Sequence, residues 1–266
     1  MAMTSTHSSV ETPSHSFFRQ TLDLLNRAGI PFLIGGAFAF IHQTGIDKST
    51  KDLDIFIRPA DVPRLLEVCR RAGLEADVVF SHWLGKIRSP EGFIDVIFNS
   101  GNGNAAVDDG WFEHARTAEL LGLAVQIAPV EETVWSKAYV MERERYDGAD
   151  VAHILLAHAP DLDWRRLIDR FGPTWRVLLA HLVLFGFIYP SERGRIPSWV
   201  MQELTDRLAE EIASPPAQER VCYGTLLSWS QYLGDVLSGD YRDGRIRPFG
   251  TMTAHEVARW TAADKG

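Results

Sequence analysis

The chain has 266 residues and a formal net charge of −8, with 45% hydrophobic and 23% charged residues. This composition is typical of a globular protein with a substantial core, and it excludes a largely disordered chain. The acidic balance disfavours non-specific nucleic-acid binding over the whole surface, although it leaves room for a local basic patch. The only two cysteines, Cys69 and Cys222, exclude a disulfide scaffold and a cysteine-rich zinc site.

We expect neither a membrane-spanning nor an export segment. The longest apolar stretch, Val177–Tyr189, contains His181 and is too short to cross a bilayer. Residues 1–16 are rich in Ser, Thr and His and lack the apolar run of a signal peptide, so we expect them to form a flexible tail. Together with the scarcity of cysteine, this favours a cytoplasmic protein.

Hydrophobic periodicity in the first part of the chain predicts helices that alternate with strands. The pattern of Asp52–Ile57, which alternates and then becomes wholly apolar, is typical of a central strand. In chain order, the expected elements are a helix over Phe17–Ala28, a strand over Pro31–Ile34, a helix over Ala37–Gln43, a strand over Asp52–Ile57 and a helix over Ala60–Ala72.

A hairpin and one further strand complete the expected sheet. The turn signal Ser-Pro-Glu-Gly at residues 89–92 separates two expected strands, Trp83–Arg88 and Phe93–Phe98. Residues 99–109 are rich in Gly and Asn and predict a loop, and Ala124–Ala128 is the last expected strand.

From Pro129 onward the pattern is helical throughout. The expected helices are Glu131–Arg143, Asp147–Ala157, Asp163–Phe171, Trp175–Phe187, Ser198–Ile212 and Glu219–Leu237. We therefore predict an α+β protein, with a tail over residues 1–16, a mixed sheet flanked by helices over residues 17–128, and an all-helical region over residues 129–266.

Three carboxylates and a glycine pair carry the chemical signal. Asp52 and Asp54 are two residues apart in an expected strand, so their side chains face the same side, where they repel each other unless a cation lies between them. Mg²⁺ prefers such oxygen ligands and also binds substrate phosphates. Asp95 is a third acid in an otherwise apolar strand. Gly35-Gly36, at the start of a helix, lets the backbone approach a phosphate closely.

The order of these motifs resembles the DNA-polymerase-β-type nucleotidyltransferase superfamily. The shared pattern is a Gly-Gly turn, an Asp-x-Asp strand and a later strand aspartate. The string Ser49–Ile55 is similar to the small bacterial branch that contains aminoglycoside nucleotidyltransferases and toxin-type nucleotidyltransferases. Residues 129–137 and 145–150 resemble the helix pair that follows the catalytic half in those proteins. The resemblance covers about residues 17–158.

The resemblance implies a metal-dependent enzyme that transfers a nucleoside monophosphate from an NTP, such as ATP, to an acceptor hydroxyl and releases pyrophosphate. It implies catalytic and metal-binding roles for Asp52, Asp54 and Asp95, with Mg²⁺ or Mn²⁺ as cofactor and with Asp95 favouring deprotonation of the acceptor. The nucleotide-binding positions that it implies are Gly35, Gly36, Thr50, Lys51 and Lys137. The implied acceptor is a small molecule, a tRNA or a protein hydroxyl, and the toxin-type members imply an antitoxin-like partner.

Two other functions stay open. One is a catalytically inactive binding or interaction protein with the same fold, and the other is a toxin-like protein controlled by a partner. Convergence of the three aspartates within metal-bridging distance is the observation that separates the catalytic hypothesis from the inactive one. A dinucleotide-binding interpretation of Gly35-Gly36 is disfavoured because the third glycine of that motif is absent.

Other polar clusters favour structural interpretations. We expect Arg145, Asp147 and Asp150 to form an ion-pair network at a helix start. The tryptophans of the helical region, including Trp260, are expected to pack rather than to form a stacking platform. The arginines of residues 165–176 are interleaved with aspartates and therefore do not predict a nucleic-acid groove.

Overall fold

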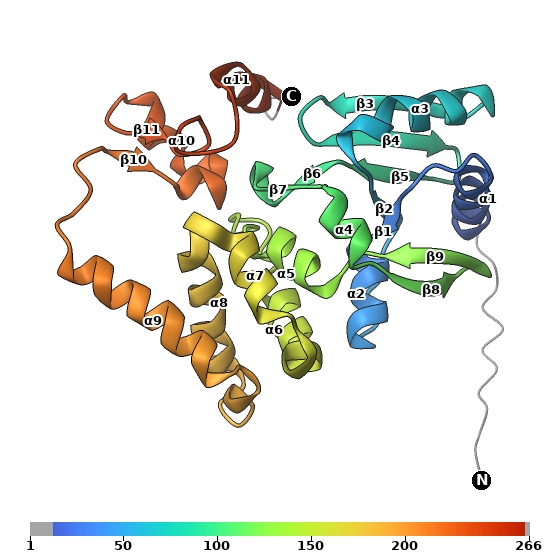
Figure 1. Ribbon diagram of the computed structural model, residues 1–266. Helices are drawn as coiled ribbons and strands as arrows, with labels where there is room; N and C mark the ends of the chain where they lie inside the picture. Colours follow the sequence, from blue (N-terminus) through green and yellow to red (C-terminus); the bar gives the residue numbers. More distant parts are fainter. Residues whose placement is uncertain (1–12, 264–266) are drawn as a thin grey trace, which may run out of the picture.

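The computed structural model describes residues 13–263 and combines a mixed β-sheet with a group of helices that follows it in the chain (Figure 1). The predicted α+β class is confirmed. Residues 1–12 of the predicted tail lie outside the described part of the chain. Helix α1 begins at Pro13, ahead of the expected start at Phe17, so residues 13–16 are helical.

The sheet has seven strands in the order β3-β4-β5-β2-β1-β9-β8. Its strands are β1 (Leu33–Ile34), β2 (Asp52–Phe56), β3 (Glu75–Phe80), β4 (Leu84–Ser89), β5 (Gly92–Ile97), β8 (Arg116–Leu120) and β9 (Leu123–Ile127). The β4–β5 hairpin is formed as predicted. Strands β2 and β5 run parallel, and their register places Asp54 directly opposite Asp95. The two strands that carry the predicted acids are therefore neighbours.

The helices are α1 (Pro13–Arg27), α2 (Gly36–Thr44), α3 (Val62–Arg71), α4 (Asp109–Glu113), α5 (Val130–Ala138), α6 (Gly148–His158), α7 (Trp164–Phe171), α8 (Trp175–Ile188), α9 (Ser198–Ala213), α10 (Trp229–Leu237) and α11 (Ala254–Ala263). Helices α1 and α3 cover one face of the sheet. Helices α4 to α8 contribute to the core on the other side, which places α5 near the opposite face.

Alternation along β2 directs its side chains into two different environments. Leu53 and Ile55 are fully buried in the core formed with α1 and α3. Phe56, on the other face, belongs to a second core that also contains Val134 of α5 and Leu155 of α6. This second core joins residues from both sides of the predicted boundary at residue 129. The sheet and the helices thus share apolar packing next to the functional face of β2.

The sequence pattern missed both edge strands. Strand β3 begins only a few residues after α3 ends, and β8 pairs with β9 alone. Both strands expose many of their side chains to solvent, so they lack the apolar signal of a central strand. The expected loop over residues 99–109 also contains the short β6–β7 pair (Asn99–Ser100 with Ala105–Ala106) and the first residue of α4.

Two helical predictions were too long. Helix α5 ends at Ala138 rather than Arg143, because Met141 turns back to pair with Tyr146. The helix expected over Glu219–Leu237 is α-helical only from Trp229, in α10, and a 3-10 turn covers Gly224–Leu226 before it. Before it, β10 (Val221–Cys222) pairs with β11 (Arg242–Asp243), so the C-terminal region is not all-helical. The partner of β10 lies about twenty residues further along the chain, beyond the reach of local periodicity.

By length and apolar composition, Trp164–Ile188 is the one described stretch that could cross a membrane. It consists of α7 and α8, which are separated by a 3-10 turn at Gly172–Thr174. Leu167 and Leu178, from the two helices, are both fully buried in the shared helical core. The stretch is therefore divided, and part of it packs inside the protein.

Candidate functional site

A pocket of about 440 Å³ lies between the sheet and α5 and gathers most of the predicted site residues. Of the predicted residues, those that line it are Gly36, Thr50, Asp52, Asp54, Asp95 and Lys137. Gly35 does not line the pocket itself but directly precedes Gly36 in the chain. Lys51 is exposed and is not among the lining residues, so the structure does not place it in the site.

The carboxylates form a group on the pocket side of β2 and β5. Asp52 and Asp54 alternate with buried leucine and isoleucine, and Asp95 faces Asp54 across the parallel register. Burial, followed by the charges of Asp52 and Asp95, raises the pKa of Asp54 from its ordinary value of 3.8 to about 7. Because Asp54 is buried and shares the site with two other acids, its full ionisation is unfavourable near neutral pH.

Lys86 of β4 is the immediate counter-charge of Asp95. The Lys86 Nζ atom lies 2.6 Å from Asp95 Oδ1, and the two residues are opposite each other in the β4–β5 hairpin. Burial raises the pKa of Asp95, although the hydrogen bond and the charge of Lys86 oppose this. Asp95 therefore lines the pocket and is also paired with Lys86.

The Gly-Gly turn is required by close packing against β2. The Gly35 amide donates to the Asp54 carbonyl oxygen at 2.9 Å, and a Cβ on Gly35 would lie 2.3 Å from the Phe56 ring. A Cβ on Gly36 would lie 1.6 Å from Asp54 Oδ2, and Gly36 also has a φ of +53°, which favours glycine. The glycine pair thus leaves room for the Asp54 carboxylate at the start of α2, a contact that the sequence alone did not reveal.

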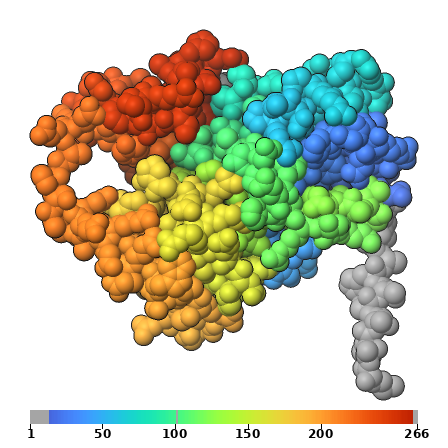
Figure 2. Space-filling view, viewed as in Figure 1, coloured from blue at the N-terminus to red at the C-terminus, as the bar shows by residue number. Residues whose placement is uncertain are grey.

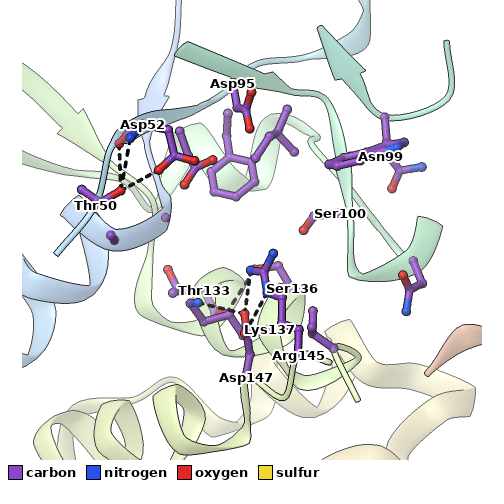
Figure 3. A pocket seen from close by; sticks show the side chains of 18 of the residues that line it. Thr50, Asp52, Asp95, Asn99, Ser100, Thr133, Ser136, Lys137, Arg145 and Asp147 are labelled. Carbon is purple, nitrogen blue, oxygen red and sulfur yellow. Dashed lines mark hydrogen bonds and ion pairs between the residues drawn. The ribbon is translucent and has the colours of Figure 1, made fainter. Parts of the chain in front are cut away.

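Thr50 orients the first carboxylate. Its hydroxyl donates to Asp52 Oδ1 at 2.6 Å, as the dashed lines in Figure 3 show. The resemblance assigned this residue to nucleotide binding, whereas its observed contacts hold Asp52. The turn before β2 therefore fixes the position of a pocket carboxylate as well as contributing to the pocket wall.

The opposite wall carries the pocket's positive charge. Lys137 of α5 lies 3.1 Å from Asp147 Oδ2 and 2.7 Å from Asp150 Oδ2, and Arg145 donates to Asp147 from two of its nitrogens. Lys48 also contacts Asp150, at 2.7 Å. The predicted network at the helix start is confirmed, and Figure 3 shows it facing the strands that carry the acids.

This network keeps its two acids ionised. Burial raises the pKa of Asp147, but the hydrogen bond from Arg145 and the charge of Lys137 outweigh burial and hold that pKa below its ordinary value. The same balance, with Lys137 and Lys48 as the cations, lowers the pKa of Asp150. Lys137 is thereby held in place at the pocket by its contacts with Asp147 and Asp150.

The donor chemistry fits a hard divalent cation at Asp52 and Asp54. Both present carboxylate oxygens to one pocket, and the raised pKa of Asp54 reflects a local excess of negative charge that a cation would relieve. Within residues 13–263, however, no three acidic, histidine or cysteine side chains are arranged closely enough to hold an ion. The described residues therefore do not show the three aspartates converged within metal-bridging distance; Asp95 instead contacts Lys86, and its role as a metal ligand stays a prediction.

The arginines of residues 165–176 do not form a free basic strip. Arg166 and Arg170 both contact the fully buried Glu132, and Arg165 pairs with Glu203. Arg176 pairs with an acid of α9. All four arginines are thus paired with acids, which agrees with the sequence interpretation that they do not form a nucleic-acid groove.

The far end of the pocket contains residues that sequence reasoning missed. Trp83 precedes β4, Trp260 lies on the C-terminal helix α11, and Asn99 and Ser100 follow β5. Trp260 was expected to serve in packing alone. The only local signals were the Gly- and Asn-rich composition of residues 99–109 and the aromatic residues themselves, and neither says that α11 reaches the sheet.

Comparison with known proteins identified similar folds among solved structures. No family model and no curated protein sequence matches the chain. An antigenic nucleotidyltransferase-like protein from Paracoccidioides brasiliensis is 15% identical, with a TM-score of 0.45 over 70% of this chain and 93% of that protein. ANT(2″)-Ia, in complex with adenylyl-2″-tobramycin, is 14% identical, with a TM-score of 0.40 over 65% of this chain and 97% of that protein.

The lincosamide antibiotic adenylyltransferase LnuA, bound to lincomycin, is 14% identical, with a TM-score of 0.38 over 54% of this chain and 96% of that protein. At these identities the similarity is one of fold, and the chemistry must be argued from this chain's own residues. The chain is thus similar in fold to solved structures that are named as nucleotidyltransferases, one of them a lincosamide antibiotic adenylyltransferase.

Proposed function

We propose that this protein is a metal-dependent nucleotidyltransferase that transfers a nucleoside monophosphate from an NTP to an acceptor hydroxyl. The observation that carries the proposal is the arrangement of Asp52, Asp54 and Asp95 on two adjacent parallel strands, opposite Lys137 and Arg145 across one pocket. An NTP and a divalent cation together supply the opposite charges that both walls require. A cytoplasmic location, where NTPs and Mg²⁺ are abundant, belongs to the same proposal.

The triphosphate is assigned to the side of the pocket formed by α2 and α5. The start of α2 is available for anion binding because Gly36 lines the pocket and brings the first turn of the helix beside Asp54. Lys137 and Arg145 offer positive charge to phosphate oxygens from the opposite wall. Asp52 and Asp54 would hold Mg²⁺ or Mn²⁺, which would supply the charge that neutralises the triphosphate.

Asp95 is assigned to the acceptor. Lys86 contacts Asp95 Oδ1, which leaves Oδ2 to receive the proton of the acceptor hydroxyl. As that proton moves to Asp95, the hydroxyl oxygen forms a bond to the α-phosphorus. The bond between the α-phosphorus and the oxygen that bridges to the β-phosphate breaks, and pyrophosphate leaves with the bonding electrons. The nucleoside monophosphate is then attached to the acceptor.

Calorimetric titration of each NTP into the protein, with and without Mg²⁺, tests the proposal. We expect binding that depends on Mg²⁺ and is lost in the Asp52→Ala/Asp54→Ala double variant. Asp161→Asn is the matched control, because this exposed acid lies outside the pocket. Failure of every NTP to bind the wild-type protein in the presence of Mg²⁺ would contradict the proposal. The nucleotide that binds most tightly identifies the preferred base.

An inactive binding protein is the second candidate, favoured by the ion pair between Lys86 and Asp95. That pair occupies one acid of the expected catalytic set. Exchange of labelled pyrophosphate into the NTP, measured in the presence of hydroxylated acceptors, separates the two candidates, because direct transfer breaks the bond between the α-phosphorus and the bridging oxygen only when an acceptor attacks, and the nucleotidylated acceptor is needed to re-form it. Binding of an NTP with neither exchange nor pyrophosphate release in the presence of these acceptors would favour the inactive protein.

A further inference from the structure

The carboxylates divide the pocket into two ends. Across the sheet, the order β4-β5-β2-β1 places Asp95 and Asp54 between Trp83, which precedes β4, and Gly36, which follows β1. Along β5, the pocket-lining side chains pass from Asp95 through Ile97 to Asn99. Figure 3 shows Asp52 and Asn99 on opposite sides of the close-up, with Asp95 between them. The Gly36 end and the Asn99 end therefore flank the acids.

In-line chemistry assigns a substrate to each end. In phosphoryl and nucleotidyl transfer, the attacking and leaving oxygens lie on opposite sides of the phosphorus atom. The proposed function places the departing pyrophosphate at the Gly36 end, beside the start of α2. The acceptor hydroxyl must then approach from the Asn99 end, where Trp83 and Trp260 line the wall.

The C-terminal segment that contains Thr251, Met252 and Trp260 packs against the protein at the Asn99 end of the pocket. The Trp260 ring stacks on the His82 ring with 4.2 Å between centroids, and the Thr251 hydroxyl donates to the Gly103 carbonyl oxygen at 3.1 Å. A Cβ on Gly103 would lie 1.8 Å from the Met252 side chain, which shows how closely the two segments approach. In Figure 2 the C-terminal residues, in red, rest against the cyan atoms of the strand region.

The chemistry of this end suits a small ring compound that carries hydroxyl groups. Aromatic faces such as that of Trp260 stack on the apolar faces of rings. Asn99 lines this end of the pocket, and a side-chain amide can both donate to and accept from a hydroxyl group on a ligand. Glu142 adds a carboxylate to the lining.

The charges of the lining argue against an RNA acceptor. The lysines and arginines that line the pocket are Lys48, Lys137 and Arg145, all of which belong to the network around Asp147 and Asp150. A nucleic-acid acceptor would need cations at the Asn99 end for its phosphates. The lining there is aromatic, neutral or acidic, which suits a neutral or cationic acceptor; Arg245 and Arg259 lie near His82, which stacks on Trp260, but do not line the pocket.

We propose that Trp83, Trp260 and Asn99 form the acceptor subsite for a small hydroxylated ring compound, and that α11 completes this subsite. The inference rests on the proposed nucleotidyl transfer and adds to it the acceptor class and the residues that position the acceptor. Trp260 is a positioning residue for the acceptor, separate from the residues assigned to the NTP.

The test uses Trp260→Ala, Trp260→Phe and Asn99→Ala in the full chain, with Trp199→Ala as control. Trp199 is an exposed tryptophan of α9 that does not line the pocket. Each variant is titrated with the preferred NTP and Mg²⁺. It is then supplied with tobramycin, sucrose or a tRNA that has a free 3′ hydroxyl, and transfer is followed by mass spectrometry.

We expect transfer to a ring compound by the wild-type protein. Trp260→Ala and Asn99→Ala should each raise the acceptor KM at least tenfold while the Kd for the NTP changes less than twofold. Trp260→Phe should restore most of the loss because it keeps an aromatic face, and Trp199→Ala should change neither constant.

Three results would overturn the acceptor subsite while leaving the proposed function intact. The first is an equal weakening of NTP binding in Trp260→Ala, which would place the nucleobase at this end. The second is an acceptor KM that is unchanged in both Trp260→Ala and Asn99→Ala. The third is transfer to the tRNA alone, or to none of the three probes, in a protein that binds NTP and releases pyrophosphate. Absence of NTP binding in the wild type would instead refute the proposed function.

Discussion

Replacing Asp54 by Asn removes the pocket carboxylate whose ionised form is disfavoured most clearly by its surroundings. The pKa of Asp54 rises from 3.8 to about 7 because the group is buried and lies near Asp52 and Asp95. Asn has nearly the same shape and carries no charge. The variant should therefore lose metal-dependent NTP binding and gain stability in the free protein.

The pH dependence of that gain follows from the direction of the shift. The folded protein keeps the Asp54 proton up to about pH 7, whereas the unfolded chain releases it near 3.8, so stability is lost as the pH rises between these values. At about 1.4 kcal/mol per unit, the raised pKa of Asp54 costs the fold about 2 kcal/mol near pH 5, where the folded protein holds the proton, and about 4 kcal/mol near pH 8.5, where Asp54 is ionised. The advantage of Asp54→Asn over the wild type should grow by about 2–3 kcal/mol across this interval.

Urea unfolding in the presence of EDTA at both pH values measures this difference. Asp161→Asn serves as the control, because it removes one exposed acid outside the pocket and should change the free energy of unfolding by less than about 0.5 kcal/mol at either pH. A stability difference between Asp54→Asn and the wild type that stays constant from pH 5 to pH 8.5 would refute the electrostatic argument. Added Mg²⁺ and NTP should stabilise the wild type and leave Asp54→Asn unchanged.

Three further substitutions probe the site and its support. Gly36→Ala would place a Cβ 1.6 Å from a carboxylate oxygen of β2, so calorimetry should show lost NTP binding, whereas Gly45→Ala, with open space around it, should retain binding despite a similar φ. Lys86→Met removes the cation that lowers the pKa of Asp95, so the acidic limb of the pH–activity profile should move to higher pH; an unmoved limb would contradict a proton-accepting role. Arg166→Met removes the arginine partner of Glu131 and one of the two arginines that contact the buried Glu132, so it should lower the free energy of unfolding by about 1–3 kcal/mol in urea, while a loss below about 0.5 kcal/mol would show that the network is dispensable.

Local periodicity determined the elements that build the catalytic half of the site. The two-residue period of a strand places Asp52 and Asp54 on one face, and the turn signal at residues 89–92 correctly predicts the hairpin that carries Asp95. The charged residues after Pro129 likewise predict the network around Asp147. These features depend on residues near one another in the chain, where a side-chain pattern reports directly on local geometry.

Only the tertiary structure decided how these elements meet. The parallel pairing of β2 with β5 sets Asp54 opposite Asp95, and the close approach of α2 to β2 makes Gly36 a neighbour of the Asp54 carboxylate. Trp260 reaches the pocket from the other end of the chain through the seating of α11 on His82. Contacts of this kind depend on packing between segments far apart in sequence, and such packing leaves no periodic signal in either segment alone.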